Sequence, residues 1–314
     1  DGSLFIRAAI DKGASAIVTS IPLDQLFTLN IGSKDATIIC VEDCRKALAS
    51  LSREFYGRPS RQLNLVGVTG TNGKTTLTYI LENIYQRIGD LSGVIGTINY
   101  RYCGKLFPAP MTTPESLELS RMMSEMVQDG AKHCFLEVSS HSLSLKRVFG
   151  MNFSVGVFTN LSRDHLDFHG DMENYKNAKM SLFREHAVGK SVINIDDPVG
   201  REIVAELKGK TAFTTGIDSP ADIMAEDLSL SEQNSRFTLK TPFGSHKIQC
   251  RLLGKHNIYN LLSASATALL QGVALENVVD GIETVAHIPG RFEQVSCGQN
   301  FTVLIDYAHT DDAL

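Results

Sequence analysis

The sequence predicts an α/β protein with a mostly parallel sheet, helices on both faces of that sheet, and a small antiparallel β subdomain. Short apolar runs that suit buried strands, over 65–68, 133–138, 153–159 and 191–195, are separated by segments with helical periodicity. Residues 210–253 differ, because their short alternating runs, broken by turn residues, are typical of hairpins. The first pattern predicts the parallel sheet and the second predicts the antiparallel part.

The composition is that of a globular protein. The 314 residues are 43% hydrophobic and 21% charged, and this length suggests two or three domains. The net charge of -5 argues against a nucleic-acid-binding surface, and no apolar run approaches the roughly 20 residues of a membrane span. The six cysteines contain no C-x-x-C pair, which suits free thiols in a reducing compartment. We therefore expect a cytoplasmic protein that binds neither nucleic acid nor a membrane. A monomer is expected as well, although no sequence feature determines the oligomeric state.

Two linker signals divide the chain, at 57–60 (GRPS) and at 288–291 (IPGR). The expected parts are 1–60, a remnant of an N-terminal α/β domain; 61–290, the central domain; and 291–314, the start of a C-terminal domain with a buried strand over 301–305. Both flanking domains are expected to be incomplete. Residue 1 leads directly into a turn and a helix, and Leu314 comes where a helix should begin.

The segment from Leu63 to Ile88 predicts a phosphate-binding loop of the P-loop type. A short apolar strand is followed by a glycine-containing turn and then by a helix with apolar residues at steps of three and four. Backbone N–H groups and the helix dipole at such a turn face an anion, Lys74 adds a positive charge, and the Thr75 hydroxyl suits a phosphate-bound Mg²⁺. The candidate phosphate-binding residues are Gly70, Thr71, Asn72, Gly73, Lys74, Thr75 and Thr76.

This loop is shorter than the usual motif. The pattern G-x-x-x-x-G-K-[ST] would place Val68 at the first glycine, whereas the chain has Gly70-x-x-Gly73. The alternative interpretation is an ordinary strand-to-helix turn that happens to contain a lysine. We favour the phosphate interpretation because every local feature agrees with it.

Polar residues follow the expected strands at their carboxyl ends, where parallel sheets bind ligands. Glu137 ends one strand, and a second strand is followed by Asn160, Asp164, His165, Asp167 and His169. With Thr75, the residues Glu137 and His165 would offer Mg²⁺ a hydroxyl, a carboxylate and an imidazole. Two alternatives stay open at this point: Glu137 caps the next turn, or His165 and His169 form a zinc pair.

Two further elements are expected beside this site. We predict a strand over 93–101 that contains Gly96, and a helix that has Thr113 as its N-cap and Pro114 at its first position.

The segments GTNGKTT, MTTPES, EVSSHSL, TNLSRDHLDFHG, YKNAKMSLF, LGKHNIYN, PGRFE and DYAHT occur in this order between Leu63 and Leu314. In this set and order the chain resembles the Mur ligases. It is most similar to the members that add the third residue to UDP-N-acetylmuramoyl-L-alanyl-D-glutamate. Residues 1–60 resemble the end of that family's UDP-binding domain, and its C-terminal ligase domain would begin near Arg291.

The resemblance implies an ATP-dependent amide ligase that uses Mg²⁺ in peptidoglycan precursor synthesis. ATP would convert a substrate carboxylate into an acyl phosphate, which an amine then attacks. The implied partners are the UDP-N-acetylmuramoyl dipeptide and a free amino acid. meso-Diaminopimelate is expected rather than L-lysine because it is the commoner specificity of the family, although the deciding pocket would lie beyond Leu314.

The resemblance also implies roles for single residues. Lys74, Lys179 and His165 would be catalytic, and Thr75, Glu137, His165 and a modified Lys179 would hold Mg²⁺. Thr112, Thr113, Ser139 and Arg147 would bind the muramoyl peptide. Asn257 would contact adenine, Asp306 the ribose, and Arg291 the phosphates. Two positions depart from the family pattern: Leu145, in the peptide site, and Asp311, where the family usually has proline.

Lys179 is interpreted differently with and without the resemblance. On a helix expected over 172–186, with Asp171 as its N-cap, it suits a solvated surface lysine. Its match to YKNAKMSLF implies instead the lysine that the family carbamylates with CO₂. A carbamate would be attracted to metal ions that repel an ammonium group.

Two rival functions share part of this sequence pattern. A folylpolyglutamate or cyanophycin synthetase would share the ATPase core, but the TTPES and EVSSHSL segments argue against it. The other rival is a nucleotide-binding fragment without ligase activity. We expect the 314-residue chain itself to be poorly active, because the domain that closes over ATP would be missing.

Overall fold

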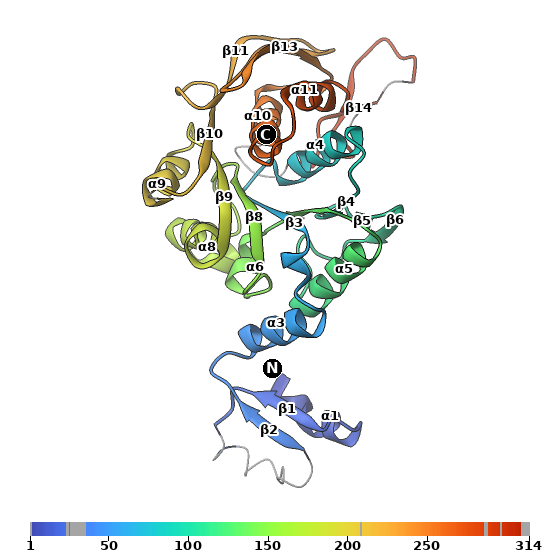
Figure 1. Cartoon of the computed structure of the whole chain (residues 1–314), viewed down its shortest axis with the longest axis vertical. Coiled ribbons are helices and arrows are strands. Elements are labelled where there is room, and N and C mark those ends of the chain that lie inside the picture. Colours follow the sequence, from blue (N-terminus) through green and yellow to red (C-terminus); the bar gives the residue numbers. More distant parts are fainter. Residues whose placement is uncertain are drawn as a thin grey trace.

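The computed structural model describes residues 2–22, 25, 36–207, 209–285, 288–295 and 297–308 (Figure 1). Its centre is a mixed sheet with the strand order β13-β12-β11-β10-β9-β8-β3-β7-β4-β5-β6. The strands are β3 (Asn64–Thr69), β4 (Ser92–Ile95), β5 (Asn99–Tyr102), β6 (Lys105–Pro108), β7 (His133–Glu137), β8 (Asn152–Phe158), β9 (Ala187–Asn194), β10 (Ala212–Gly216), β11 (Ile223–Leu230), β12 (Ser235–Thr241) and β13 (Gly244–Cys250). All pairs from β4 across to β11 are parallel, and the pairs at both edges are antiparallel. The predicted fold class is confirmed.

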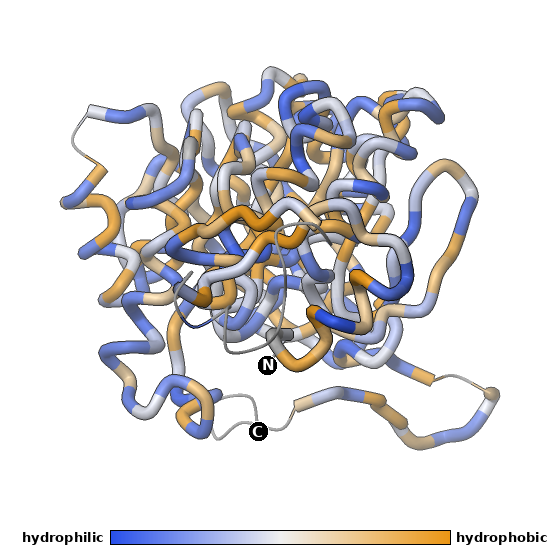
Figure 2. The backbone as a smooth tube through the Cα atoms, turned by 90° about the horizontal axis from the view of Figure 1, so that it is seen from below, coloured by the Kyte–Doolittle hydropathy of each residue, from blue (hydrophilic) through white to orange (hydrophobic). Residues whose placement is uncertain are grey.

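Helices cover both faces of this sheet (Figure 1). One face carries α4 (Lys74–Arg87), α10 (Lys255–Leu270) and α11 (Leu275–Glu283), and the other carries α5 (Ser116–Gln128), α6 (Ser140–Ser144), α8 (Met172–Glu185) and α9 (Pro198–Leu207). Val66 and Val68 of β3 pack into the core under α4 and α10, whereas Leu65 packs into the opposite core. This alternation follows the two-residue period of a strand. Figure 2 shows apolar stretches of the backbone crossing the middle of the molecule.

The N-terminal residues form a smaller unit beside the sheet. It contains a 3-10 turn η1 (Gly2–Phe5), α1 (Ile6–Asp11) and the parallel strands β1 (Ala16–Thr19) and β2 (Thr37–Cys40), and it is followed by α3 (Cys44–Phe55) and η2 (Pro59–Arg61). α3 lies between β1–β2 and the main sheet (Figure 1) and packs against α5. Its Arg53 Nη1 donates to the Gly150 carbonyl at 2.8 Å. The division of the chain into domains at 60 and 290 stays a prediction.

The strand expected over 93–101 is in fact two strands, and this prediction was wrong. β4 ends at Ile95, and β5 then runs back antiparallel to it. The cause is Gly96, where a Cβ atom would lie 2.1 Å from Glu137 Oε1. The chain turns around this carboxylate, and the Thr97 N–H donates to the same oxygen at 3.0 Å. The glycine therefore marks a turn around a buried carboxylate.

Helix α5 begins later than predicted. Its first residue is Ser116 and its N-cap is Glu115, not Thr113. The Thr113 hydroxyl donates instead to the Glu137 carbonyl at 2.7 Å. Because that hydroxyl is already bonded to β7, it does not cap the helix.

The antiparallel strands over 210–253 are present, but they extend the main sheet and are not a separate small sheet. β10 lies parallel to β9, and β11 lies parallel to β10. β12 and β13 then add to β11 as an antiparallel edge. The unused backbone edge of β9 explains the join, since a buried strand must pair on both sides.

The strand expected over 301–305 is shorter and less buried than predicted. β15 (Val303–Ile305) pairs only with β14 (Glu293–Val295) in the described part of the chain. Phe301 is 66% exposed and Ile305 is 49% exposed. The apolar sequence of this segment therefore predicted a strand correctly, but the prediction that the strand is buried was wrong.

His186, which follows α8, gives a test of stability against pH. Burial lowers the pKa of His186 to about 4, and among the described residues its Nδ1 has no hydrogen-bond partner. The folded state therefore binds this proton less readily than the unfolded state, whose pKa is about 6.5. This contribution to stability is complete above the unfolded pKa and is lost as the pH falls from there towards 4, by up to about 3 kcal/mol.

The measurement is urea unfolding of the wild type and His186→Phe between pH 7 and pH 4. The difference between the two proteins removes the common effect of the carboxylates. We expect the wild type to lose more stability on acidification, and parallel curves would contradict the assignment.

Candidate active site

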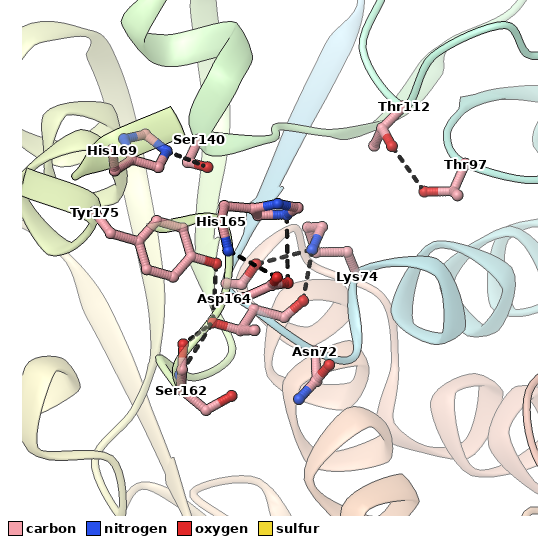
Figure 3. Close-up of polar contacts among 12 residues, drawn as sticks. Asn72, Lys74, Thr97, Thr112, Ser140, Ser162, Asp164, His165, His169 and Tyr175 are labelled. Carbon is pink, nitrogen blue, oxygen red and sulfur yellow. Dashed lines mark hydrogen bonds and ion pairs between the residues drawn. The ribbon is translucent and has the colours of Figure 1, made fainter. Parts of the chain in front are cut away.

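A cavity of about 990 Å³ lies at the carboxyl ends of the central parallel strands. Its lining includes the glycine turn and the start of α4, the loops after β4, β7, β8 and β9, and the residues around the start of α10 and beside β14 and β15. Figure 3 shows part of this site, with Lys74, Asp164 and His165 turned toward one another. The structure thus places the expected strand-end residues in one cavity, as the fold rule for parallel sheets predicts.

The glycine turn is shaped by backbone angles and by close packing. Gly70 has φ +147° and Gly73 has φ +90°, which are conformations that glycine adopts easily. A Cβ atom on Gly73 would lie 2.3 Å from Asn260 Oδ1. Lys74 Nζ folds back over the turn and donates to the carbonyls of Gly70 and Thr71, both at 2.8 Å. The shorter spacing of the glycines therefore still gives a turn that leads into the N-terminus of α4.

The residues that follow β8 form hydrogen bonds with this turn. Asn72 N–H donates to Asn160 Oδ1 at 2.8 Å, and the Thr159 hydroxyl donates to the Asn72 carbonyl at 2.6 Å. Thr71 N–H donates to the Asn160 carbonyl at 2.9 Å. The turn is thus ordered by the protein itself.

Glu137 is the buried carboxylate at the centre of the site, with 1% of its surface exposed. Its Oε2 accepts from the hydroxyls of Thr75 at 3.1 Å and Thr97 at 2.8 Å. Burial lowers the pKa of Lys74, and the nearby Glu137 charge opposes this effect. The alternative role of Glu137, as a cap for the next turn, receives no support, because Ser139 caps α6.

The geometry around Glu137 fits Mg²⁺. Two adjacent ligands in an octahedron with bonds of about 2.1 Å lie about 3.0 Å apart. Thr75 Oγ1 and Glu137 Oε2 are separated by 3.1 Å. A hydroxyl and a carboxylate are also oxygen ligands of the kind that Mg²⁺ prefers. These two residues could therefore occupy neighbouring positions around the ion.

His165 lines the same cavity but contacts a different residue. Its Nε2 lies 3.3 Å from Asp164 Oδ2, and its backbone N–H donates to Asp164 Oδ1 at 2.8 Å. Burial lowers the pKa of His165. His169 instead lies 3.0 Å from the Ser140 hydroxyl. Within the residues described, no three His, Cys, Asp or Glu side chains gather around a metal position, so the zinc alternative receives no support.

Lys179 is not the solvated lysine that its helix alone suggested. It is 1% exposed, and its Nζ donates to the Gly70 carbonyl at 2.7 Å. Burial lowers the pKa of Lys179 well below its ordinary value, and the Lys74 charge lowers it further. The lysine on α8 is therefore an internal part of the site.

The expected peptide-binding residues form one network at the cavity. Thr112 and Ser139 line it, whereas Thr113 is completely buried and its hydroxyl lies 3.3 Å from the Ser139 hydroxyl. Arg147 lies behind them, where it donates to the Thr113 carbonyl at 3.0 Å and forms an ion pair with Glu115 at 2.8 Å. Thr113 and Arg147 thus support the residues that line the cavity from behind.

The expected nucleotide-binding residues line the other end of the cavity. Asn257 Nδ2 donates to the Leu253 carbonyl at 2.8 Å, and Arg291 Nη2 lies 3.4 Å from Thr75 Oγ1. Asp306 accepts from the Phe292 and Ala308 N–H groups. All three border the same space. Leu145 ends α6, and Asp311 lies outside the described residues.

Two residues of the site were missed by the sequence analysis. Thr97 bonds to Glu137 through both its N–H and its hydroxyl. Tyr175 is completely buried, and its hydroxyl lies 3.1 Å from that of Thr71. Gly96 was the only sequence feature that pointed to Thr97. Tyr175 lies in the YKNAKMSLF segment, but nothing in that segment indicated its role.

The fold and the glycine turn define this chain as an α/β protein of the P-loop type. Its sequence matches the Mur ligase middle domain over residues 68–268, and the chain belongs to the Mur ligase family. The structure described here contains no helix long and apolar enough to cross a membrane.

Proteins named UDP-N-acetylmuramoyl-L-alanyl-D-glutamate–2,6-diaminopimelate ligase are similar over the entire chain. Those of Geobacillus kaustophilus and Clostridium tetani are each 43% identical, and the chain covers 64% of either protein. A solved structure of a ligase with that name has a TM-score of 0.85 and 29% identity, covering 99% of this chain and 62% of the other. The chain thus spans less than two thirds of the length of these relatives.

A folylpolyglutamate synthase of Mycobacterium tuberculosis shares the fold alone. Its TM-score is 0.68 at 19% identity, and the match covers 85% of this chain and 68% of the other. The fold is therefore shared by folylpolyglutamate synthases and Mur ligases, and only the sequence identity distinguishes the two groups.

Proposed function

We propose that this chain is the central part of an ATP-dependent ligase that adds meso-diaminopimelate to UDP-N-acetylmuramoyl-L-alanyl-D-glutamate. The observation that carries the proposal is the meeting of Lys74, Thr75 and Glu137 at one cavity, in a chain 43% identical to ligases of that name. The proposed role is in peptidoglycan precursor synthesis.

In the proposed reaction, an oxygen of the D-glutamyl carboxylate attacks the γ-phosphorus of ATP, giving an acyl phosphate and ADP. The amine of the incoming amino acid then attacks the acyl carbon, and phosphate leaves as the amide forms. Such chemistry depends mainly on positioning and on neutralising phosphate charge. Lys74 and the N–H groups at the start of α4 would hold the phosphates, and Arg291 would approach them from the side of β14.

Mg²⁺ would neutralise charge on the phosphate oxygens. Thr75 and Glu137 would hold it, because their oxygens already lie at the spacing of adjacent ligands. His165 would contribute after its imidazole turns from Asp164. Lys179, as a carbamate, would add a negatively charged, carboxylate-like group beside Lys74. The positive charges of Lys74 and Mg²⁺ would both attract this group.

The remaining residues would bind substrates at the two ends of the cavity. Thr112 and Ser139 would face the muramoyl peptide, with Thr113 and Arg147 behind them. Asn257 and Asp306 would contact adenine and ribose. The choice of diaminopimelate over L-lysine is supported by the names of the relatives.

Lys74→Met tests the nucleotide site. We expect the affinity of the chain for Mg²⁺–ATP, measured by calorimetry, to fall at least about tenfold, since a buried positive charge near the phosphates is lost. Lys176→Met is the matched control, because Lys176 lies on α8 in ion pairs with Glu173 and Glu202, both outside the cavity. Equal affinity of wild type and Lys74→Met would contradict the proposal.

The substrate class is tested by ADP release with each acceptor. We expect release with the UDP-N-acetylmuramoyl dipeptide and none with a folate, at a low rate for the 314-residue chain. The opposite preference would favour the folate-type ligase. Rapid turnover would contradict the view that this part of the protein is poorly active alone.

A further inference from the structure

We propose that Tyr175, acting through Thr71, is a positioning residue that holds the phosphate-binding turn in shape before nucleotide arrives. This inference rests on the proposed function, because it takes residues 70–73 as the phosphate site. Tyr175 lies on α8, is completely buried, and does not line the cavity. Any effect on the ligand must therefore pass through the residues that it contacts.

The hydrogen bonds of Thr71 fix the direction of this contact. Its hydroxyl lies 3.2 Å from the Ser162 carbonyl, 3.0 Å from the Ser162 N–H and 3.1 Å from the Tyr175 hydroxyl. A threonine hydroxyl has one proton to donate and two lone pairs. The Ser162 carbonyl accepts that proton and the Ser162 N–H fills one lone pair, so Tyr175 donates to the other. The Thr71 hydroxyl then has a partner for its proton and for both of its lone pairs.

Tyr175 suits the role of a fixed donor. Burial raises the pKa of Tyr175 to about 12, so that the hydroxyl keeps its proton near neutral pH. Its ring is also held in place, packing against His169 at 5.1 Å between ring centroids.

The same side chain supports the turn at a second point. Lys179 Nζ lies 4.5 Å from the centre of the Tyr175 ring and donates to the Gly70 carbonyl. The Thr71 carbonyl, in turn, accepts from Lys74 Nζ. Tyr175 therefore connects α8 to both residues whose carbonyls orient the Lys74 ammonium group. A turn ordered before binding avoids the entropy cost of ordering it on binding.

The test is Tyr175→Phe, which removes only the hydroxyl. We expect the affinity for Mg²⁺–ADP to fall about fivefold to tenfold, the value of one hydrogen bond. Without nucleotide, the amides of residues 70–73 are expected to exchange with solvent deuterium faster than in the wild type. In a double-mutant cycle with Thr71→Val, the two substitutions should not be additive, since both remove the same bond.

Tyr85→Phe is the matched control. Tyr85 is 1% exposed and its hydroxyl donates to Gln271, near the other end of α4. The control loses a buried tyrosine hydrogen bond without touching the turn. An equal loss of affinity in Tyr85→Phe would show a general effect of stability and would overturn the proposal.

Unchanged affinity and exchange in Tyr175→Phe would also overturn it. If the wild type fails to bind Mg²⁺–ADP, the proposed function is wrong. In that case, comparing amide exchange at residues 70–73 between the wild type and Tyr175→Phe still shows whether Tyr175 orders the turn.

Discussion

Lys179→Met is expected to abolish the ¹³C label that the proposed carbamate would take up from labelled bicarbonate in the wild-type chain. A neutral lysine amine attacks the carbon of CO₂, and loss of one proton leaves the carbamate anion. Burial and the Lys74 charge both lower the pKa of Lys179, which favours the neutral amine. The ¹³C carbonyl signal of the folded protein measures the modification.

Lys190→Met is the matched control for this substitution. Lys190 also donates to a backbone carbonyl, that of Leu270, but it is exposed and lies outside the cavity. The labelled signal should persist in this variant. An unlabelled wild type, or a label that survives Lys179→Met, would rule out Lys179 as the modified residue. The stability of Lys179→Met is expected to change little, because an apolar side chain of similar length replaces a buried amine.

Glu137→Ala is expected to lose about 3 kcal/mol of unfolding free energy and the dependence of nucleotide binding on Mg²⁺. Three hydrogen bonds, from Thr75 and from two groups of Thr97, end on this buried carboxylate. Each lost bond costs about 1 kcal/mol. In the wild type, Mg²⁺ should strengthen ATP binding about tenfold, a difference of about 1.4 kcal/mol.

Glu82→Ala separates the two effects of Glu137→Ala. Glu82 is a half-buried carboxylate on α4 that pairs with Arg101 away from the cavity. It should lose stability as well, but it should keep the Mg²⁺ dependence. If Glu137→Ala unfolds, Glu137→Gln provides a milder variant with nearly the same shape. Full Mg²⁺ dependence in a folded Glu137 variant would remove this residue from the metal site.

Much of the site could be predicted from local sequence. Gly70, Gly73 and Lys74 lie within one short segment, and the strand-to-helix pattern around them leaves few conformations open. Glu137 and His165 are expected to meet this turn because Glu137 ends one parallel strand and His165 follows the end of another. Both do line its cavity.

Other parts of the site and the sheet depend on contacts between distant segments, which local sequence patterns do not predict. Thr97 reaches Glu137 only because the chain turns at Gly96, and the sequence pattern there suited a continuous strand. The joining of β10 to β9 likewise depends on pairing between segments that are distant in the chain.

The sequence by itself determined the fold class and the phosphate turn, because hydrophobic periodicity and glycine conformations act over short distances along the chain. Only the tertiary structure decided which side chains are buried and what they contact. Lys179 is the clearest case: its helical neighbours suit a solvated lysine, and packing against Tyr175 and Gly70 makes it internal. Burial arises from segments far apart in sequence, and it sets the charge state on which the proposed chemistry depends.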